Sequence, residues 1–331
     1  TRLYHANARS LPIPDNSVDC VVTSPPYWGL RDYGLEQTVW GGDKTCEHEW
    51  GGILSRRTNG NTSETYAPKQ ASNTGALLEV NQGSFCTFCS SWLGTLGLEP
   101  TPDAYCANMV AVFREVWRVL KPTGTVWMNL GDSYAGSTTL GRNDVDRKYP
   151  GSIGKGLESS QGSRQMPNGL KSKDLVGIPW RVAFALQADG WYLRSDIIWS
   201  KPNPMPESVT DRPTKSHEYV FLLTKNVRYY YDPDAIREIT GSEVSWETWQ
   251  KTRNIKIEND THGDLQRGVN GGFGAKEKSF SHPQGRNKRS VWEIATQPYP
   301  EAHFATYPEK LVEPCILAGS SEKGVCAQCG K

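Results

Sequence analysis

Residues 23–28, Thr-Ser-Pro-Pro-Tyr-Trp, bring a hydroxyl group, two carbonyls beside rigid proline rings and an aromatic face into six consecutive positions. The Ser24 hydroxyl and the Pro25 carbonyl can accept hydrogen bonds, so together they suit a planar base with an exocyclic amine. They would hold the amine hydrogens while the nitrogen lone pair turns toward an electrophile, and Tyr27 would stack on the base. The alternative is a strand followed by a Pro-Pro turn that has only a structural role.

The segment before this motif predicts the element that positions it. Residues 18–22 are mainly β-branched and apolar, which is typical of a buried strand. Pro25 and Pro26 end the strand, because neither has an N–H to donate to a sheet and each keeps the preceding residue extended. Ser24 is therefore expected at the C-terminal end of a strand, where open α/β sheets bind their ligands.

Further elements of an α/β sheet are predicted along the chain. Residues 101–120 have apolar side chains on one helical face behind an N-cap threonine, and residues 125–130 read as a strand. This helix–turn–strand order is typical of a crossover in a parallel sheet. A second helix is predicted at residues 179–190. Side chains that alternate along residues 191–199 predict a strand with a two-residue period, and 220–223 is a further short apolar strand.

Two pairs of soft ligands, Cys46-x-His48 and Cys86-x-x-Cys89, have metal-binding spacing, and each pair can occupy two corners of a zinc tetrahedron. Residues 51–83 between them are polar, so a structural zinc would supply stabilisation that apolar burial cannot. We therefore predict a zinc-bearing insertion at residues 40–97. Free cysteines are the alternative, and a disulfide is disfavoured because an intracellular protein lies in a reducing compartment.

The other cysteines fall into two groups. Cys20, Cys106 and Cys315 are isolated in apolar segments and are predicted to be small buried hydrophobic residues. Cys326 and Cys329 form another C-x-x-C pair near the end of the sequence. A zinc knuckle of this form needs a second pair of ligands to complete four. Cys326 and Cys329 are therefore predicted to bind a metal only if another segment supplies that pair.

Residues 23–28 resemble the catalytic motif of the DNA amino-methyltransferases, in which a Ser/Asp/Asn-Pro-Pro-Tyr/Phe tetrapeptide binds the amine of a flipped base. Other segments resemble phage and bacterial members of that family, in the permuted β-type order with this motif near the N-terminus: residues 11–19, 120–134, 197–204 and 303–308. The resemblance implies one α/β catalytic domain over residues 1–331. Its expected fold is that of the class I methyltransferases, a Rossmann-like mixed sheet flanked by helices, with loop and zinc-bearing insertions. The strands at 191–199 and 220–223 are expected to form the antiparallel hairpin of that sheet.

The resemblance further implies transfer of a methyl group from S-adenosyl-L-methionine (SAM) to the exocyclic amine of a base flipped out of double-stranded DNA. The implied catalytic residues are Ser24, Pro25, Pro26 and Tyr27. In the family, Ser at the first position is associated more with cytosine N4 and Asp more with adenine N6. Cytosine N4 is therefore the predicted target and adenine N6 the alternative. The expected cofactor-binding residues are Asn7, Asp132, His303, Phe304, Ala305 and Thr306.

For two of these residues, Asn7 and Asp132, the sequence also offers a reason against a strong contact with the cofactor. Asn7 stands where relatives often have an aspartate, which is expected to weaken contact with the cofactor's adenosine. Asp132 follows a glycine at a predicted strand end, so capping of the next segment is an equal alternative for it.

The predicted base-pocket and DNA-binding residues are Trp28, Lys201, Asn203, Arg286, Lys288 and Arg289. Lys201 and Asn203 lie in a proline-rich segment that is close to the base pocket in relatives, with a rigid turn as the alternative. Residues 251–290 carry nine Lys or Arg against four acids, so the region 240–290 is predicted to recognise the target sequence. A solvated loop with ordinary basic residues is the alternative there. Residues 134–173 predict a mobile loop that closes over the substrate.

Composition restricts the other classes of function. With a formal charge of +1, any DNA-binding face must be a local patch. No run of 18 apolar residues and no signal peptide is present, so a soluble cytoplasmic protein is expected. Members of the family often act beside a cognate restriction enzyme, although phage-borne members commonly act alone.

Two features predict that the chain is part of a longer protein. It begins at Thr1, and it lacks the Asp-Pro-Phe-x-Gly-x-Gly turn with which relatives approach SAM. A zinc-stabilised DNA-binding component without catalysis is therefore a hypothesis of a different class. A methyltransferase for protein glutamine or RNA is a third, because related motifs act on other planar amides and amines.

Overall fold

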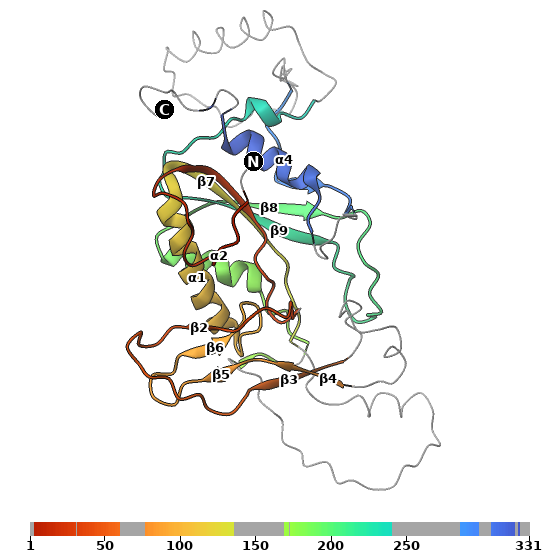
Figure 1. The fold of residues 1–331 in the computed structure, drawn as a ribbon. Helices are drawn as coiled ribbons and strands as arrows, with labels where there is room; N and C mark the ends of the chain where they lie inside the picture. Colours follow the sequence, from red (N-terminus) through yellow and green to blue (C-terminus); the bar gives the residue numbers. More distant parts are fainter. Residues whose placement is uncertain are drawn as a thin grey trace, which may run out of the picture.

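The computed structural model describes residues 3–30, 32–59, 77–135, 169–171, 173–239, 285–297, 306–321 and 324. Its centre is a five-stranded sheet in the order β1-β7-β9-β8-β10 (Figure 1). The strands are β1 (Val18–Thr23), β7 (Leu120–Leu130), β8 (Tyr192–Ser200), β9 (His217–Thr224) and β10 (Val291–Glu293). Most of the predicted regions 134–173 and 240–290 lie outside the described residues, as do Cys326 and Cys329.

The first crossover of the sheet runs through α1 (Pro102–Val119), which joins β1 to β7. The two strands pair in parallel, as the sequence predicts. Thr101 caps the helix, because its side-chain oxygen accepts the Ala104 N–H at 3.1 Å, and Pro102 begins it with a preset φ. Eight buried side chains on one face of α1 then hold it against the sheet.

The strand β7 begins earlier than the sequence predicts, at Leu120 rather than residue 125. Lys-Pro-Thr-Gly at 121–124 has the composition of a turn, but it forms a bulge in extended backbone instead. Val18 pairs with Leu120 and Cys20 with Thr125, so the extra residues of β7 are accommodated between these two pairs.

The other half of the sheet is a hairpin. Helix α2 (Ile178–Ala188) precedes β8, and β8 pairs with β9 in antiparallel register, as predicted. The alternating burial of β8 confirms the predicted two-residue period. Because β9 is antiparallel to both β7 and β8, the C-terminal ends of β1, β7 and β8 lie at the same edge as the N-terminal end of β9.

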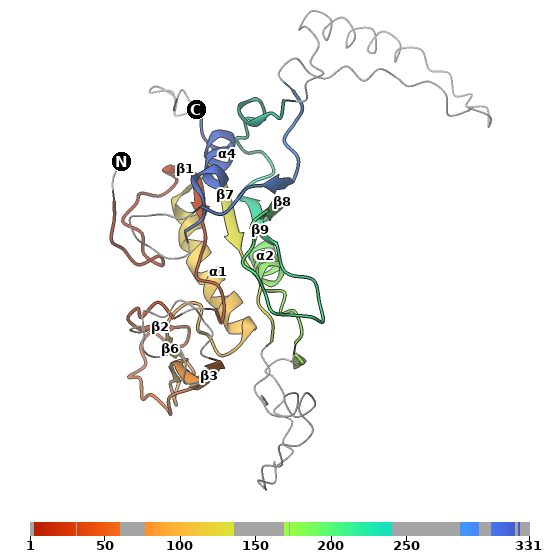
Figure 2. The same ribbon diagram turned by 90° about the vertical axis from the view of Figure 1, so that its right-hand side faces the viewer.

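Helices cover both faces of the sheet (Figures 1 and 2). Val126, Met128 and Leu130 of β7 pack in one buried cluster with α1 and α2. Trp127 belongs to a second cluster with α4 (Glu309–Gly319), because neighbouring side chains of a strand point to opposite faces. The predicted α/β architecture, a mixed sheet flanked by helices, is confirmed. No helix among the described residues is long and apolar enough to cross a membrane.

A small separate sheet lies beside the N-terminal end of α1 (Figure 1). It contains β2 (Thr38–Trp40), β6 (Trp92–Gly94) and β5 (Ser84–Phe85), in that order. A hairpin of β3 (Ser55–Asn59) and β4 (Leu77–Asn81) adjoins it. These elements fall almost wholly within the predicted insertion at residues 40–97, with β2 beginning two positions earlier.

Candidate active site and metal centre

A cavity of about 260 Å³ lies at the edge of the sheet where β1, β7 and β8 end and β9 begins. Its position follows from the topology, because strand ends that converge at one edge leave their side chains free to line a ligand site. The lining residues are Ser24, Pro25, Tyr27, Leu30, Tyr33, Asn129, Trp199, Lys201, Glu218, Thr296, Thr306 and Tyr307. Residues predicted as catalytic, base-binding and cofactor-binding thus share one cavity.

Ser24 lies directly after β1 and faces two polar neighbours. Its hydroxyl is 3.3 Å from the Tyr27 hydroxyl and 3.4 Å from Oδ1 of Asn129. The Tyr27 hydroxyl is itself 2.8 Å from the same Asn129 oxygen. Asn129, the penultimate residue of β7, therefore lies within hydrogen-bond distance of both hydroxyls of the Pro-Pro motif.

Glu218 completes this network from the start of β9. Its Oε2 accepts the Tyr27 hydroxyl at 2.7 Å and the Asn129 amide at 3.1 Å, while Oε1 pairs with the Lys201 ammonium. Burial, followed by the nearby Glu218 charge, raises the pKa of Tyr27 well above its ordinary value. Tyr27 is thus a neutral phenol at physiological pH, and its hydroxyl donates to the carboxylate.

The ring of Tyr27 lies against the backbone where β7 ends. A Cβ at Gly131 would come within 2.6 Å of the Tyr27 ring, so only glycine allows this approach. With its hydroxyl bound and its ring in contact with Gly131, Tyr27 has one well-defined orientation beside Ser24. That orientation gives the motif the rigidity that positioning a substrate requires.

Lys201 and Asn203 follow β8 and have different roles in the structure. Lys201 lines the cavity, and its Nζ lies 4.2 Å from the centre of the Trp199 ring. Asn203 is not among the lining residues. Its amide exchanges hydrogen bonds with the backbone of Thr296, at 3.0 Å and 3.3 Å, and so holds a segment that does line the cavity.

The structure places the other predicted site residues as follows. Thr306 lines the cavity, whereas His303, Phe304 and Ala305 lie outside the described residues. Oδ1 of Asp132 accepts the N–H groups of Gly177 and Ile178 at 3.0 and 2.9 Å, so it caps α2. Asn7 is exposed in the N-terminal segment, where its side chain accepts the Arg9 N–H at 2.9 Å.

Trp28 and the basic cluster lie away from the cavity lining. Trp28 is buried in the core, and its ring N–H donates to the Glu99 carbonyl at 2.8 Å. Arg286 and Arg289 both bind Oε2 of Glu238 at 3.0 Å, and Lys288 lies over the Trp292 ring. Part of the positive charge predicted to contact phosphates is therefore paired within the protein.

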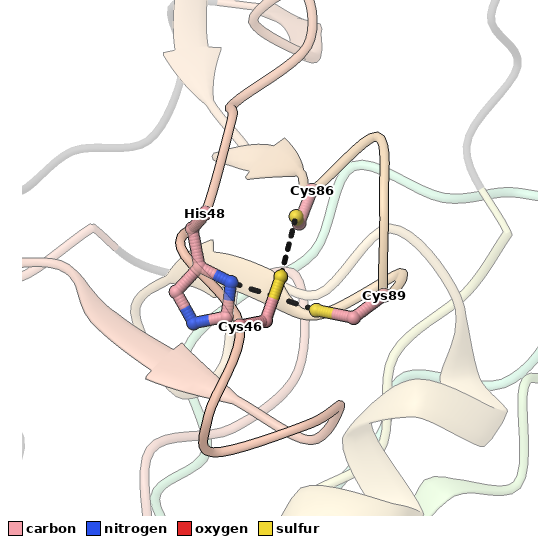
Figure 3. A group of neighbouring side chains, drawn as sticks. All are labelled: Cys46, His48, Cys86 and Cys89. Carbon is pink, nitrogen blue, oxygen red and sulfur yellow. Dashed lines mark hydrogen bonds between the residues drawn. The ribbon is translucent and has the colours of Figure 1, made fainter.

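The predicted metal ligands come together in the small sheet (Figure 3). The ligand atoms of Cys46, His48, Cys86 and Cys89 all lie within 4.8 Å of one another. The Cys46 and Cys86 sulfurs are 3.9 Å apart, and the Cys89 sulfur is 3.5 Å from Nδ1 of His48. Tetrahedral zinc with bonds of about 2.0–2.3 Å separates its ligand atoms by about 3.5–3.8 Å. The residues therefore fit a zinc ion.

The surroundings of Cys89 favour its metal-binding form. Hydrogen bonds from the side chain and then the backbone of Ser91 lower the pKa of Cys89 to about 6. Cys89 is thus mostly a thiolate at neutral pH, which is the form that binds a metal. The Phe88 N–H donates to the Cys86 sulfur at 3.4 Å, an additional bond that orients this ligand.

Sequence analysis did not identify two residues of the site, Asn129 and Glu218. Asn129 lies within a segment that carries the family resemblance, but nothing local marks its side chain as the partner of Ser24. One local feature could have drawn attention to Glu218: it is a carboxylate near the start of the apolar strand 217–224, where a charged group needs a partner. Its partner Tyr27 lies 191 positions away, so the pairing depends on the fold.

Comparison with known proteins identifies the family. The DNA methylase model of N6- and N4-methyltransferases matches residues 18–327. The chain is 37% identical to the type II methyltransferase M.Cfr9I of Citrobacter freundii over 308 residues, 93% of this chain and 68% of that protein. It is also 37% identical to M.SmaI of Serratia marcescens over 306 residues, 92% and 70% of the two chains.

Among solved structures, the cytosine-N4-specific PvuII DNA methyltransferase matches with a TM-score of 0.43 and 11% identity, over 95% of this chain and 67% of that one. The family assignment rests on the sequence matches, which cover nearly all of the chain and include the residues around the cavity. The chain belongs to the DNA methylase family of N6- and N4-methyltransferases.

Proposed function

We propose that this chain transfers a methyl group from SAM to the exocyclic amine of a base flipped out of double-stranded DNA, with cytosine N4 as the target. The observation that carries the proposal is that Ser24 and Pro25 both line a cavity at the strand ends, where the hydroxyl of one and the carbonyl of the other can act as acceptors. These two acceptors match the two hydrogens of an amine. The choice of cytosine depends on the serine at position 24.

The protein's own residues account for the handling of the amine. Ser24 and the Pro25 carbonyl accept hydrogen bonds from its two hydrogens, which points the nitrogen lone pair toward the methyl donor. After the methyl group is transferred, the nitrogen loses one of these protons to water. Asn129 and Tyr27 orient the Ser24 hydroxyl, and Glu218 anchors both of them. Catalysis of this kind depends on positioning more than on a strong base.

A second hollow next to Ser24 fits the methyl donor. It has a volume of about 720 Å³, and it is lined by Ser24, Thr306, Tyr307, Glu309, Val312, Glu313, Ile316 and Leu317. Two carboxylates beside apolar side chains suit a ligand that combines positive charge with an aromatic base. SAM, when bound, supplies an electrophilic methyl group on a positively charged sulfur. Ser24, Thr306 and Tyr307 line both hollows, so the amine and the donor would meet beside Ser24.

We also propose that Cys46, His48, Cys86 and Cys89 bind a structural zinc ion. The support is that two of their separations, 3.9 Å and 3.5 Å, are close to those of a tetrahedral site, together with the polar composition of the segment that they enclose. Double-stranded DNA as the substrate is consistent with the type II methyltransferase relatives. A cognate restriction enzyme is part of the proposal because such an enzyme is typical of restriction-modification systems.

The function is tested by incubating the full-length protein with labelled SAM and duplex DNA, then separating the nucleosides by mass spectrometry. N4-methylcytosine is the expected product. N6-methyladenine would leave amine methylation in place but refute cytosine as the target. Absence of both, with no heat of SAM binding in titration calorimetry, would instead support a zinc-stabilised DNA-binding component.

A further inference from the structure

The turn that carries the catalytic motif is held from behind by a second loop. We call residues 24–29 the catalytic turn and residues 95–101, between β6 and α1, the brace loop. Three hydrogen bonds join the catalytic turn to the brace loop and α1. They run from the Tyr105 hydroxyl to the Pro26 carbonyl at 2.8 Å, from the Trp28 ring N–H to the Glu99 carbonyl at 2.8 Å, and from the Gly29 N–H to the Gly97 carbonyl at 2.7 Å.

The two segments are also in close van der Waals contact at Gly97. This residue has a φ of +95°, and a Cβ there would lie 3.1 Å from Cβ of Pro26 and 3.3 Å from the Tyr27 carbonyl. The catalytic turn therefore rests directly on the backbone of the brace loop. A shift of the brace loop by a few tenths of an ångström would move the catalytic turn with it.

The conformation of the brace loop depends on one buried carboxyl group. Glu99 is 0% exposed. Its Oε2 accepts the Gly97 N–H at 2.8 Å, and its Oε1 accepts the Asn108 side-chain amide of α1 at 3.0 Å. Within the described residues no Lys, Arg or His forms a salt bridge with Glu99. A carboxyl group buried without a cation is costly, so these two hydrogen bonds hold it in place.

We propose that Glu99 is a positioning residue for methyl transfer, because its carboxyl group fixes the brace loop and the brace loop fixes the catalytic turn. The inference rests on the proposed methyltransferase function of Ser24 and Tyr27. It also gives the metal-bearing insertion a role, since β6 leads directly into the brace loop and pairs with β5, the strand before Cys86. The insertion is thus joined to the catalytic turn through the brace loop.

The test compares substitutions of Glu99 in the full-length, metal-loaded protein, with steady-state methylation of duplex DNA as the readout. Glu99→Leu removes both acceptors and should lower kcat by about 10- to 100-fold, the loss expected when reacting groups are displaced by a fraction of an ångström to one ångström. The KM for DNA should change less than about threefold, because Glu99 does not line the cavity. Glu99→Gln should retain most of kcat, since its oxygen accepts the Gly97 N–H and the Asn108 amide can rotate to accept its NH₂.

A second pair of variants, which swaps the hydrogen-bond donor and acceptor between residues 99 and 108, keeps the test decisive if Glu99→Leu folds poorly. Asn108→Asp alone places two carboxyl groups against each other and should lower kcat. The double variant Glu99→Gln/Asn108→Asp restores a donor–acceptor pair and should recover most of it. Glu115→Leu is the matched control, because Glu115 is another carboxylate of α1, bound to Leu11 and Arg118 and remote from the catalytic turn.

The possible outcomes separate this inference from the proposed function. An inactive wild-type protein would contradict the function itself. An active wild type, with a kcat in Glu99→Leu equal to that in Glu115→Leu, would overturn the positioning role of Glu99. Failure of the double variant to recover activity lost in Asn108→Asp would overturn it as well.

Discussion

At the scale of single residues, the reactivity of this site depends on how one hydroxyl is oriented. Ser24 has an ordinary side chain, and its hydrogen-bond partners among the described residues, Tyr27 and Asn129, are not strong bases. Its neighbours Tyr27 and Asn129 are themselves fixed by Glu218, so the hydroxyl belongs to a network with few alternative arrangements. Such a network favours one direction for the lone pairs that receive the amine hydrogens.

Removal of the Ser24 hydroxyl is the direct test of its role. Ser24→Ala should lower kcat by about 100-fold, the typical loss when a group that orients or stabilises the transition state is removed. The affinity for DNA should stay within about threefold, because phosphate contacts dominate that affinity. Methyl incorporation and gel-shift titration measure the two quantities. Ser17→Ala, which removes an exposed serine bound to the Pro14 carbonyl, is the control. Equal turnover in the two variants would contradict the proposed role of Ser24.

At the scale of elements, the small sheet and the brace loop extend the catalytic domain in one continuous unit. The strands β5 and β6 are short, and the segment around them is polar, so their apolar contacts alone give limited stability. The four metal ligands connect residues 46–48 to residues 86–89 across this sheet. The stability of the insertion is therefore expected to depend on metal binding.

Cys86→Ser tests this dependence. The native protein should contain one zinc ion per chain by elemental analysis, and the variant should contain none. Loss of the metal should speed amide hydrogen exchange at Thr87, whose N–H binds the Glu49 carbonyl, by on the order of 100-fold. Exchange in β7 and β9 should stay unchanged. Cys106→Ser is the control, because Cys106 is buried in the core outside the cluster. A native protein without zinc would rule out the site.

Gly97→Ala tests the contact between the brace loop and the catalytic turn. Alanine at a φ of +95° costs about 1–2 kcal/mol of stability, and its Cβ would press on Pro26 and Tyr27. We expect a loss of kcat beyond that caused by strain alone. Gly190→Ala is the matched control, since Gly190 has a φ of +109° and a Cβ added there would meet no atom of another segment within 4 Å. If both variants lose the same activity, the contact does not position the catalytic turn.

At the scale of the whole molecule, the buried Glu99 links folding to pH. Desolvation raises the pKa of Glu99 to about 7 from an ordinary 4.5, despite hydrogen bonds that act in the opposite direction. Between these two pH values the folded protein keeps a proton that the unfolded chain has released. This group therefore makes the free energy of unfolding fall as the pH rises from about 4.5 to about 7.

The magnitude of that pH effect can be measured by comparison with Glu99→Gln. A raised pKa of this size corresponds to on the order of 3 kcal/mol, lost across the interval and constant above it. Denaturant unfolding of both proteins at pH 4.5, 6, 7 and 8 gives the difference in slope. The Gln variant has no such group, so it should gain in relative stability as the pH rises. Parallel pH profiles for the two proteins would show that Glu99 titrates normally.

Much of the fold could be predicted because its signals are local. The cap at Thr101, the apolar face of α1 and the alternation in β8 each lie within one element, and the structure confirms each of them. The predicted start of β7 is wrong, because a Pro-Gly segment that resembles a turn lies in a bulge. Cys106 and Cys315 are buried as predicted, whereas Cys20 is only partly buried.

The sequence alone determined that Ser24, the two prolines and Tyr27 are adjacent and directly follow a strand, which is the basis of the proposed chemistry. It also determined the spacing of the four proposed metal ligands, which is a local property of two short segments. Only the tertiary structure decided which distant side chains contact Ser24 and Tyr27. Asn129 lies 102 positions and Glu218 lies 191 positions from Tyr27. They meet because β1 and β7 run in parallel while β9 runs against them, so two strand ends and one strand start converge at a single edge.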